Sequence, residues 1–290
     1  MDGGRILVVG ATGRVGGAAV RYLLEAGFQV RALVRSAQKG TVPRAQGAEV
    51  VVGDVTQPAT LAPALEGCSG VFSALSAATD RAAVEVEYRG NVNLISAARE
   101  NGVRRFVYSS AFLVDHPLAQ EVGTFREKLR FEQHLLEAQD VSSTILRPVS
   151  FMETLLLSMS GPFAFVIGRQ NRRAGWISAS DIGHAAARAF ERDITGRHEL
   201  AGPDIATFDE AYRHLSRARG KRIIVLHAPL AAVRAVGQAV APVEELAGIF
   251  TLFDAAGYVS ESTALRDTFG VDGISIEEWA GRVSSSGQVG

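Results

Sequence analysis

RILVVGATGRVG, which spans residues 5–16, joins a short apolar run to three regularly spaced glycines. The apolar run predicts a buried strand that ends at Val9. After the glycines the apolar residues recur with helical spacing, and Gly27 is a typical C-terminal stop for that helix. A strand that passes through a glycine turn directly into a helix is the usual start of a βαβ unit.

Outward from this stretch, short apolar runs alternate with helical patterns through the first half of the chain. We expect strands over residues 28–34, 48–52, 70–74, 105–108 and 143–146, and helices over residues 83–100 and 125–138. The strands are apolar throughout, which is typical of a parallel sheet covered by helices on both faces. The predicted fold class is therefore α/β, a Rossmann-type doubly wound parallel sheet.

The regular alternation of strand and helix patterns ends after Pro148. Residues 151–168 are apolar and irregular, a clean helix pattern returns at residues 181–191, and capping boxes begin at Thr207 and Ser275. We predict a first domain over residues 1–150, to which residues 175–200 return. Residues 151–174 and 201–290 are expected to form a smaller C-terminal α/β lobe.

The bulk composition limits the classes of partner. The 290 residues carry a formal net charge of -1, which predicts no overall attraction to nucleic acid or to an anionic membrane. No uncharged apolar stretch reaches the ~18 residues that a membrane span needs, so no membrane insertion is expected. Cys68 is the only cysteine, which suits a reducing compartment, and we expect a cytoplasmic monomer or homodimer.

The glycine turn has the features of a pyrophosphate site. Glycines remove the β-carbons that would keep a phosphate away from the backbone, and the helix N-terminus supplies N–H donors and positive partial charge. The spacing is G-x-x-G-x-x-G, and a tight turn without a ligand is the alternative. The order strand, turn, helix, strand favours dinucleotide binding. The residues expected to bind the cofactor here are Gly10, Thr12, Gly13, Arg14, Val15 and Gly16.

The end of the second strand indicates which dinucleotide is bound. NAD sites usually place Asp or Glu about 20 residues after the glycines, where it holds the ribose 2′-hydroxyl. Residues 32–36 read ALVRS and contain no acid. Arg35 could instead pair with a 2′-phosphate, and Arg14 could close over the same group. We expect NADP(H) to be preferred and NAD(H) to be possible; the alternative is that Arg35 is a solvated loop cation.

Six segments together resemble the NmrA-like family of the atypical short-chain dehydrogenase/reductase superfamily. They are VVGATGRVG at 8–16, VRALVRS at 30–36, GDV at 53–55, NGVRRFVYSSA at 101–111, ILRPVSFMET at 145–154 and ISASDIGHAAARAF at 177–190. The resemblance implies an NAD(P)-binding Rossmann domain and a C-terminal substrate-binding lobe, with the active site between them.

The resemblance also implies roles for single residues. Asp54 would accept a hydrogen bond from the adenine amino group, and Val55 would pack on the ring. The remaining cofactor contacts would be Ala74, Leu75 and Ser76 after the fourth strand, and Pro148, Val149 and Phe151 at the nicotinamide end. Asp54 could instead cap the following turn, and Phe151 and Met152 could simply belong to the core.

The catalytic pattern departs from most short-chain dehydrogenases. Those enzymes use Tyr-x-x-x-Lys, in which the tyrosine transfers a proton and the lysine binds the ribose. The candidate lysine is Lys128, but Thr124 stands where the tyrosine would be. The resemblance implies that Lys128 serves alone as acid/base or ribose anchor; the alternative is a surface lysine paired with Glu132.

Ser109 and Ser110 are the other catalytic candidates. They follow the fifth strand, where this fold exposes strand ends to a ligand, so one of them could hold a substrate carbonyl. The alternative is an ordinary hydrogen-bonded strand end. The histidines show no metal-ligand spacing, and no metal is expected.

Two functions remain open. The first is an NAD(P)H-dependent oxidoreductase that transfers hydride to a small carbonyl, enone or quinone held beneath Phe151, Met152 and residues 155–165. That apolar segment favours it, because small-ligand pockets are lined mainly by such side chains. The second is a non-catalytic redox sensor or assembly protein that binds NADP(H), which the missing tyrosine favours. We expect the enzyme.

Overall fold

The computed structural model describes residues 3–256, 260 and 262–285, and its centre is a seven-stranded sheet. The strands lie in the order β11-β6-β5-β4-β1-β2-β3, and every neighbouring pair is parallel. Their bounds are β1 Gly3–Val9, β2 Phe28–Val34, β3 Glu49–Val52, β4 Cys68–Ser73, β5 Arg105–Ser109, β6 Ser142–Pro148 and β11 Gly196–Leu200. The predicted Rossmann-type fold class is confirmed.

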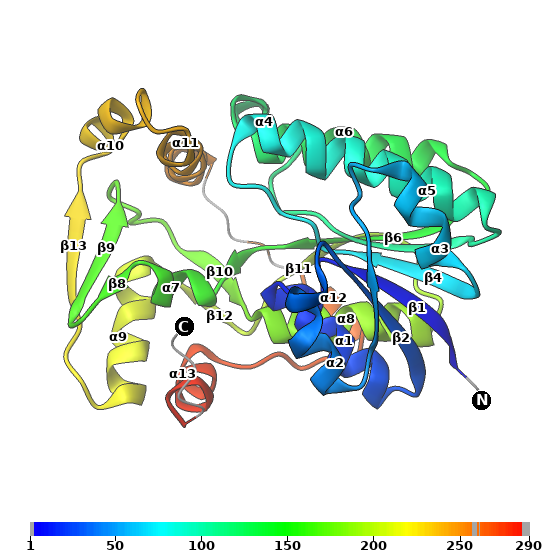
Figure 1. The fold of residues 1–290 in the computed structure, drawn as a ribbon. Coiled ribbons are helices and arrows are strands. Elements are labelled where there is room, and N and C mark those ends of the chain that lie inside the picture. The colour runs from blue at the N-terminus through cyan, green and yellow to red at the C-terminus, as the bar shows by residue number, and fades with distance from the viewer. Residues whose placement is uncertain (1–2, 257–259, 261, 286–290) are drawn as a thin grey trace.

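The strand order reverses between β1 and β4. The chain leaves β1 for β2 and β3 on one side and then returns to β4 on the other side of β1. Just beyond these strands, the N–H of Ala74 donates to the carbonyl of Val9 at 3.0 Å. In open parallel sheets, ligands bind at such a reversal, beyond the carboxyl ends of the strands. In Figure 1 these ends point toward the lobe formed by the second half of the chain.

Helices cover both faces of the sheet (Figure 1). One layer contains α1 Arg14–Glu25, α2 Thr41–Gln46 and α8 Ala179–Glu191, and the other contains α3 Leu61–Leu65, α5 Asn91–Glu100 and α6 Gly123–Glu137. Along β1, Ile6 and Val8 pack into the core on one face, and Leu7 and Val9 pack into the core on the other. This alternation buries β1 on both sides, as its apolar sequence predicts.

The helix predicted over residues 83–100 is divided into two kinds of helix. η3 Ala83–Gly90 is π-helical, and α5 continues from it as an α-helix. Extended π-helical turns are rare, and single ones frequently occur at functional sites. The short elements of this domain are η1 Ala37–Gly40, η2 Pro58–Thr60, α4 Asp80–Ala82 and η4 Pro117–Glu121.

The second lobe is built on two three-stranded sheets, β12-β10-β7 and β13-β9-β8. The strands are β7 Ser150–Phe151, β8 Met159–Ser160, β9 Phe163–Ile167, β10 Ala174–Ile177, β12 Asp204–Ala206 and β13 Ile224–Ala228. The helices are α7 Glu153–Leu157, α9 Phe208–Arg219, α10 Leu230–Gly237, α11 Ala241–Ala256 and α13 Ile276–Ser285. The core of this lobe contains Trp176, Phe208 and Tyr212.

Both capping boxes form as the sequence predicts. The Thr207 hydroxyl accepts the N–H of Glu210 at 3.1 Å, and the Glu210 carboxylate accepts the N–H of Thr207 at 2.9 Å. Ser275 and Glu278 repeat this exchange at the start of α13. By sequence, α12 Ala264–Asp267 falls within residues 201–290 of the predicted C-terminal lobe. Its Leu265 nevertheless packs into the core between the central sheet and α8. No helix among the described residues is both long and apolar enough to span a membrane.

Candidate functional site

The glycine turn between β1 and α1 is shaped by two close backbone contacts. Gly10 has a φ of 83°, and a β-carbon there would lie 2.5 Å from the carbonyl oxygen of Ala74. A β-carbon on Gly16 would lie 2.1 Å from the carbonyl oxygen of Gly10. Glycine is therefore required at both positions by the packing of the turn itself.

Gly13 differs from the other two glycines. Its φ is −84°, which any residue can adopt, and an added β-carbon would approach only the Gly10 carbonyl, at 3.2 Å. It is the N-cap of α1, and no side chain caps the helix there. The first N–H groups of α1 therefore remain available to an anion beside a residue without a side chain.

Two exposed arginines follow the first two strands of the sheet. Arg14 begins α1, and Arg35 follows β2. Neither forms a hydrogen bond or ion pair within the described part of the chain. Their charge is therefore exposed, and binding of a phosphate by Arg14 and Arg35 stays a prediction. Thr12 is exposed, and Val15 is half-buried against the core.

Asp54 caps a turn. Its Oδ1 accepts the N–H of Thr56 at 2.9 Å and the Thr56 hydroxyl at 2.8 Å. The structure thus shows the capping role that was the alternative, while Oδ2 has no hydrogen-bond partner in the described chain. Val55 is buried and packs against Gly90, where a β-carbon would lie 2.6 Å from its Cγ2. The adenine contacts of Asp54 and Val55 stay predictions.

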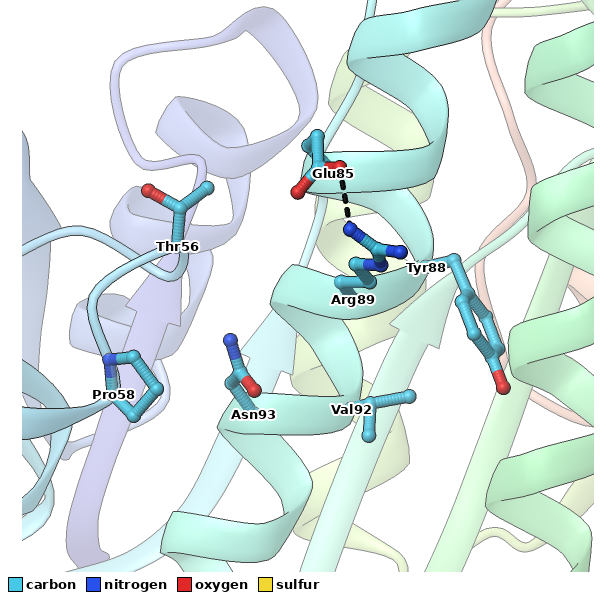
Figure 2. A pocket seen from close by; sticks show the side chains of 7 residues that line it. All are labelled: Thr56, Pro58, Glu85, Tyr88, Arg89, Val92 and Asn93. Atoms are coloured by element: carbon cyan, nitrogen blue, oxygen red, sulfur yellow. Dashed lines mark hydrogen bonds and ion pairs between the residues drawn. The ribbon is translucent and has the colours of Figure 1, made fainter.

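A shallow cavity of about 280 Å³ lies beside this segment (Figure 2). Thr56 and Pro58 form one wall, and η3 with the start of α5 forms the other. An ion pair of 2.7 Å joins Glu85 to Arg89 along the helix. The cavity contains none of the predicted cofactor residues.

Lys128 is the centre of a buried polar cluster. It projects from α6, its side chain is only 11% exposed, and its Nζ lies 3.1 Å from Oε2 of Glu87. The same ammonium donates to the carbonyl oxygens of Leu75 at 3.4 Å and Ser109 at 3.5 Å. These carbonyls mark the ends of β4 and β5. Lys128 therefore lies at the carboxyl edge of the sheet, beside two predicted site residues.

The suggested pairing of Lys128 with Glu132 is wrong. Glu132 is fully buried and forms a bidentate pair with Arg147, with contacts of 2.6 and 3.0 Å. Although Lys128 and Glu132 are one turn apart, Lys128 turns toward Glu87 on the neighbouring helix. Burial explains the difference, because each charged group needs an opposite charge within its own buried pocket.

Thr124, which stands where a catalytic tyrosine would be, is bonded to the second lobe. Its N–H and its hydroxyl both donate to Oε1 of Glu245, at 2.7 and 2.6 Å. Glu245 comes from α11, so this contact joins the lobe to the helix that carries Lys128. The carboxylate accepts from the first turn of α6, where the helix dipole favours negative charge.

The two candidate serines are buried at the end of β5. Ser109 presents its carbonyl to Lys128. Ser110 donates its N–H to Leu146 at 2.8 Å, but its hydroxyl has no hydrogen-bond partner among the described residues. Such a buried unpaired hydroxyl is uncommon, and a ligand could satisfy it. The ring of Tyr108 lies beneath the Lys128 ammonium, with its centroid 5.6 Å from Nζ, and belongs to the core.

The residues predicted at the nicotinamide end divide between surface and core. Pro148 and Val149 are buried, and Phe151 is half-buried on the edge of the first core. Met152 is fully buried in the core of the second lobe, which is the alternative that the sequence left open for it. Ala74 and Leu75 are half-buried after β4, and Ser76 is exposed.

Residues 155–165, predicted to cover the substrate, form α7, β8 and part of β9. Ala164 is buried in the lobe core, while Phe163 and Phe165 are 40% and 48% exposed. Two acids of this cluster, Glu87 and Glu245, are not among the residues predicted for the site. Glu87 lies on the buried stripe of its helix with Ala83, Asn91 and Leu94, and an acid on such a stripe was the available signal.

The fold defines an α/β protein of Rossmann type, and the glycine turn and the lysine at the strand ends form a candidate site at its topological switch point. The profile of the NmrA-like family matches residues 2–283. The chain belongs to this family, which confirms the resemblance described above.

Named relatives include both a reductase and an assembly factor. The NAD(P)H azoreductase of Xenophilus azovorans is 31% identical over 69% of this chain and 71% of that protein. The photosystem II assembly factor Ycf39 of Synechocystis sp. is 29% identical over 79% of this chain and 72% of that protein. The crystal structure of the NADPH-dependent quinone oxidoreductase QOR2 of Escherichia coli, complexed with NADPH, has a TM-score of 0.81 at 24% identity and covers 96% of this chain and 99% of its own.

Proposed function

We propose that this protein is an NADP(H)-dependent reductase of a small apolar acceptor, such as a carbonyl, an enone or a quinone. One observation carries the proposal: the Lys128 ammonium is held at the ends of β4 and β5, next to the strand-order reversal where this fold binds its ligand. The names of two relatives, an azoreductase and a quinone oxidoreductase, support the reaction class.

The residues present fit a phosphorylated dinucleotide. Gly13 leaves open the space beside the uncapped N-terminus of α1, which suits a pyrophosphate. Arg35, exposed and unpaired in the described chain, suits the 2′-phosphate that distinguishes NADP(H) from NAD(H). Acids are absent from residues 32–36, so the residues around Arg35 in the sequence supply no carboxylate that would repel that phosphate.

NADPH, when bound, supplies the hydride. The protein's own part is to hold the acceptor and to provide the proton that completes a two-electron reduction. Lys128 is a suitable donor, because an ammonium gives one proton to the reduced acceptor and regains it from water. The unpaired Ser110 hydroxyl can donate a hydrogen bond to the acceptor oxygen.

The test is NADPH oxidation with quinone, aldehyde and enone acceptors. Lys128→Met alone would leave Glu87 as an unpaired buried charge, so the informative variant is the double change Lys128→Met, Glu87→Gln. We expect it to lose turnover by at least about 100-fold. Lys221→Met, which removes an exposed lysine of the second lobe, is the matched control and should retain full activity. Absence of acceptor reduction by the unmodified protein would overturn the proposal.

A second function is supported by a specific feature. The Lys128 ammonium is already paired with Glu87 and donates to the carbonyls of Leu75 and Ser109, and Thr124 is bonded to Glu245. This arrangement also suits a structural cation in a dinucleotide-binding sensor or assembly protein. One relative carries the name of an assembly factor.

A further inference from the structure

Glu87 is fully buried, which is rare for a carboxylate unless it is paired. Its Oε1 accepts the N–H of Ala77 at 2.7 Å, and its Oε2 lies 3.1 Å from the Lys128 Nζ. Each oxygen therefore meets a different part of the site. One contact fixes the loop after β4, and the other fixes the lysine on α6.

The backbone of Glu87 is itself anchored to β4. Asn91 donates its amide N–H to the Glu87 carbonyl at 2.7 Å, and its Oδ1 accepts the Ser73 hydroxyl at 2.6 Å. Glu87 also lies within the π-helical segment, an uncommon geometry that surrounding contacts must stabilise. The carboxylate is thus rigidly placed.

The surroundings of Glu87 act on its pKa in opposite directions. Burial raises the pKa of Glu87, and the Lys128 ammonium and the Ala77 N–H oppose that rise; Glu245 adds to it. Burial and the nearby acids Glu87 and Glu132 hold the pKa of Tyr108 well above its usual range, so this neighbour stays neutral. Lys128 is therefore the one cation of the described chain within ion-pair distance of Glu87.

Without Glu87, the lysine would have only two long contacts. The carbonyls of Leu75 and Ser109 are 3.4 and 3.5 Å from Nζ, at the limit of hydrogen-bond length. Two such contacts hold a flexible ammonium weakly, whereas the ion pair with Glu87, at 3.1 Å in a buried setting, adds the attraction of an opposite charge.

We propose that Glu87 is the positioning residue of this site: it holds Lys128 as an ammonium against the ends of β4 and β5, and ties it to the loop of residues 74–77. The inference rests on the proposed function. Glu87 orients the proton donor through Lys128 and does not itself contact the acceptor.

The experiment measures how fast Lys128 is acetylated, which is practical because the chain has few lysines. The chain contains three, Lys39, Lys128 and Lys221, so brief acetylation by an N-hydroxysuccinimide ester followed by peptide mass spectrometry reports each separately. Only a free amine reacts, and an ammonium held by a carboxylate is protected. In Glu87→Gln, we expect Lys128 to acetylate about tenfold faster relative to Lys221, the lower end for loss of an adjacent opposite charge.

The control is Glu85→Gln, the same chemical change on an exposed residue of the same helix, which should leave Lys128 labelling unchanged. Glu87→Asp keeps the charge but withdraws it by one methylene, and should give an intermediate rate. In turnover, Glu87→Gln should lower kcat about tenfold with little change in the KM for NADPH, whereas a merely structural loss would not separate the two.

The outcomes separate this inference from the proposed function. If no acceptor is reduced by the unmodified protein, the proposed function fails and the labelling still decides the role of Glu87. If Glu87→Gln folds and Lys128 labelling is unchanged, the inference is overturned whatever the turnover. If Glu87→Gln does not fold, Glu87→Asp takes its place. A Lys128 acetylation rate in Glu87→Asp equal to that of the unmodified protein overturns the inference.

Discussion

At the scale of single residues, the three glycines of the first turn have different reasons to be glycine. Gly16 is required by the fold, because a β-carbon would lie 2.1 Å from a backbone carbonyl. Gly13 has an ordinary φ and only one contact, at 3.2 Å. We expect Gly13→Val to fold with a moderate loss of thermal stability and to lose dinucleotide binding, because its methyl groups would fill the phosphate space.

Gly16→Ala is the contrasting variant, and it should lose stability before binding can be tested. Thermal unfolding and NADPH titration by tryptophan fluorescence measure the two effects separately. Normal binding by Gly13→Val would mean that the phosphates lie elsewhere.

Arg35 is the residue on which the choice of dinucleotide depends. Its guanidinium is exposed and has no partner in the described chain, so binding a 2′-phosphate breaks no existing contact. We expect NADPH to bind more tightly than NADH, and Arg35→Ala to remove most of that difference. A charge-assisted bidentate contact contributes roughly 1.5–3 kcal/mol, which is on the order of ten- to a hundredfold in Kd.

Arg44→Ala removes another exposed arginine, from α2, and serves as the control for a general loss of positive charge. Isothermal titration with both cofactors gives the comparison. Equal affinities in the unmodified protein would contradict the role of Arg35.

At the scale of elements, α6 is held to the sheet by a buried ion pair. Glu132 on α6 and Arg147 on β6 make a bidentate contact, and both side chains are almost fully buried. Arg147→Met would leave the Glu132 charge without its partner, and we expect a loss of about 3–5 kcal/mol in the free energy of unfolding. Urea denaturation measures it.

The double change Arg147→Met, Glu132→Met should recover most of that loss, since no charge then remains buried. Asp115, the second partner of Arg147, is 59% exposed, and Asp115→Asn should cost less than about 1 kcal/mol. A double variant no more stable than Arg147→Met would show that the side-chain shapes, rather than the charges, matter here.

The central elements could be predicted from sequence because their apolar pattern is local. β1, β2 and β4 are buried on both faces, and their apolar runs were sufficient to place them. β11 was not predicted because its sequence, GRHEL, lacks an apolar run. The strand lies at the edge of the sheet, and only its Leu200 is buried. The π-helical turns of η3 have the same apolar spacing as an α-helix, so the sequence predicted one continuous helix.

The site was predictable only in part for a related reason. Lys128 could be found from its spacing and context, but its partner could not. Glu87 is 41 residues earlier and Glu245 is more than 100 residues later in the chain, and only the tertiary packing brings them to α6. Local spacing instead suggested Glu132, whose charge is taken by Arg147.

At the scale of the whole molecule, the candidate site faces the junction of two lobes. Glu245 of α11 binds Thr124 at the start of α6, and Leu252 of α11 packs with Val122 and Phe125. The helix that carries Lys128 is therefore coupled to the lobe expected to bind substrate. A ligand that contacts both lobes would stabilise this arrangement to the extent that it binds this arrangement better than any other.

This coupling allows the reductase and the sensor to be distinguished by adding NADPH and measuring both acceptor turnover and proteolysis of the second lobe. At about 100 times its Kd, NADPH should raise the free energy of unfolding by about 2.7 kcal/mol. Phe163 and Phe165 are exposed on β9, so chymotryptic cleavage there reports the state of the second lobe. Turnover of an acceptor accompanied by protection of β9 is the result expected for a reductase that closes on its ligands. Protection without reduction of any acceptor would favour the sensor or assembly role, and the non-binding Gly13→Val variant should then show no protection. If the unmodified protein gives neither turnover nor protection, both functions are contradicted, because each requires NADPH binding to reach the second lobe.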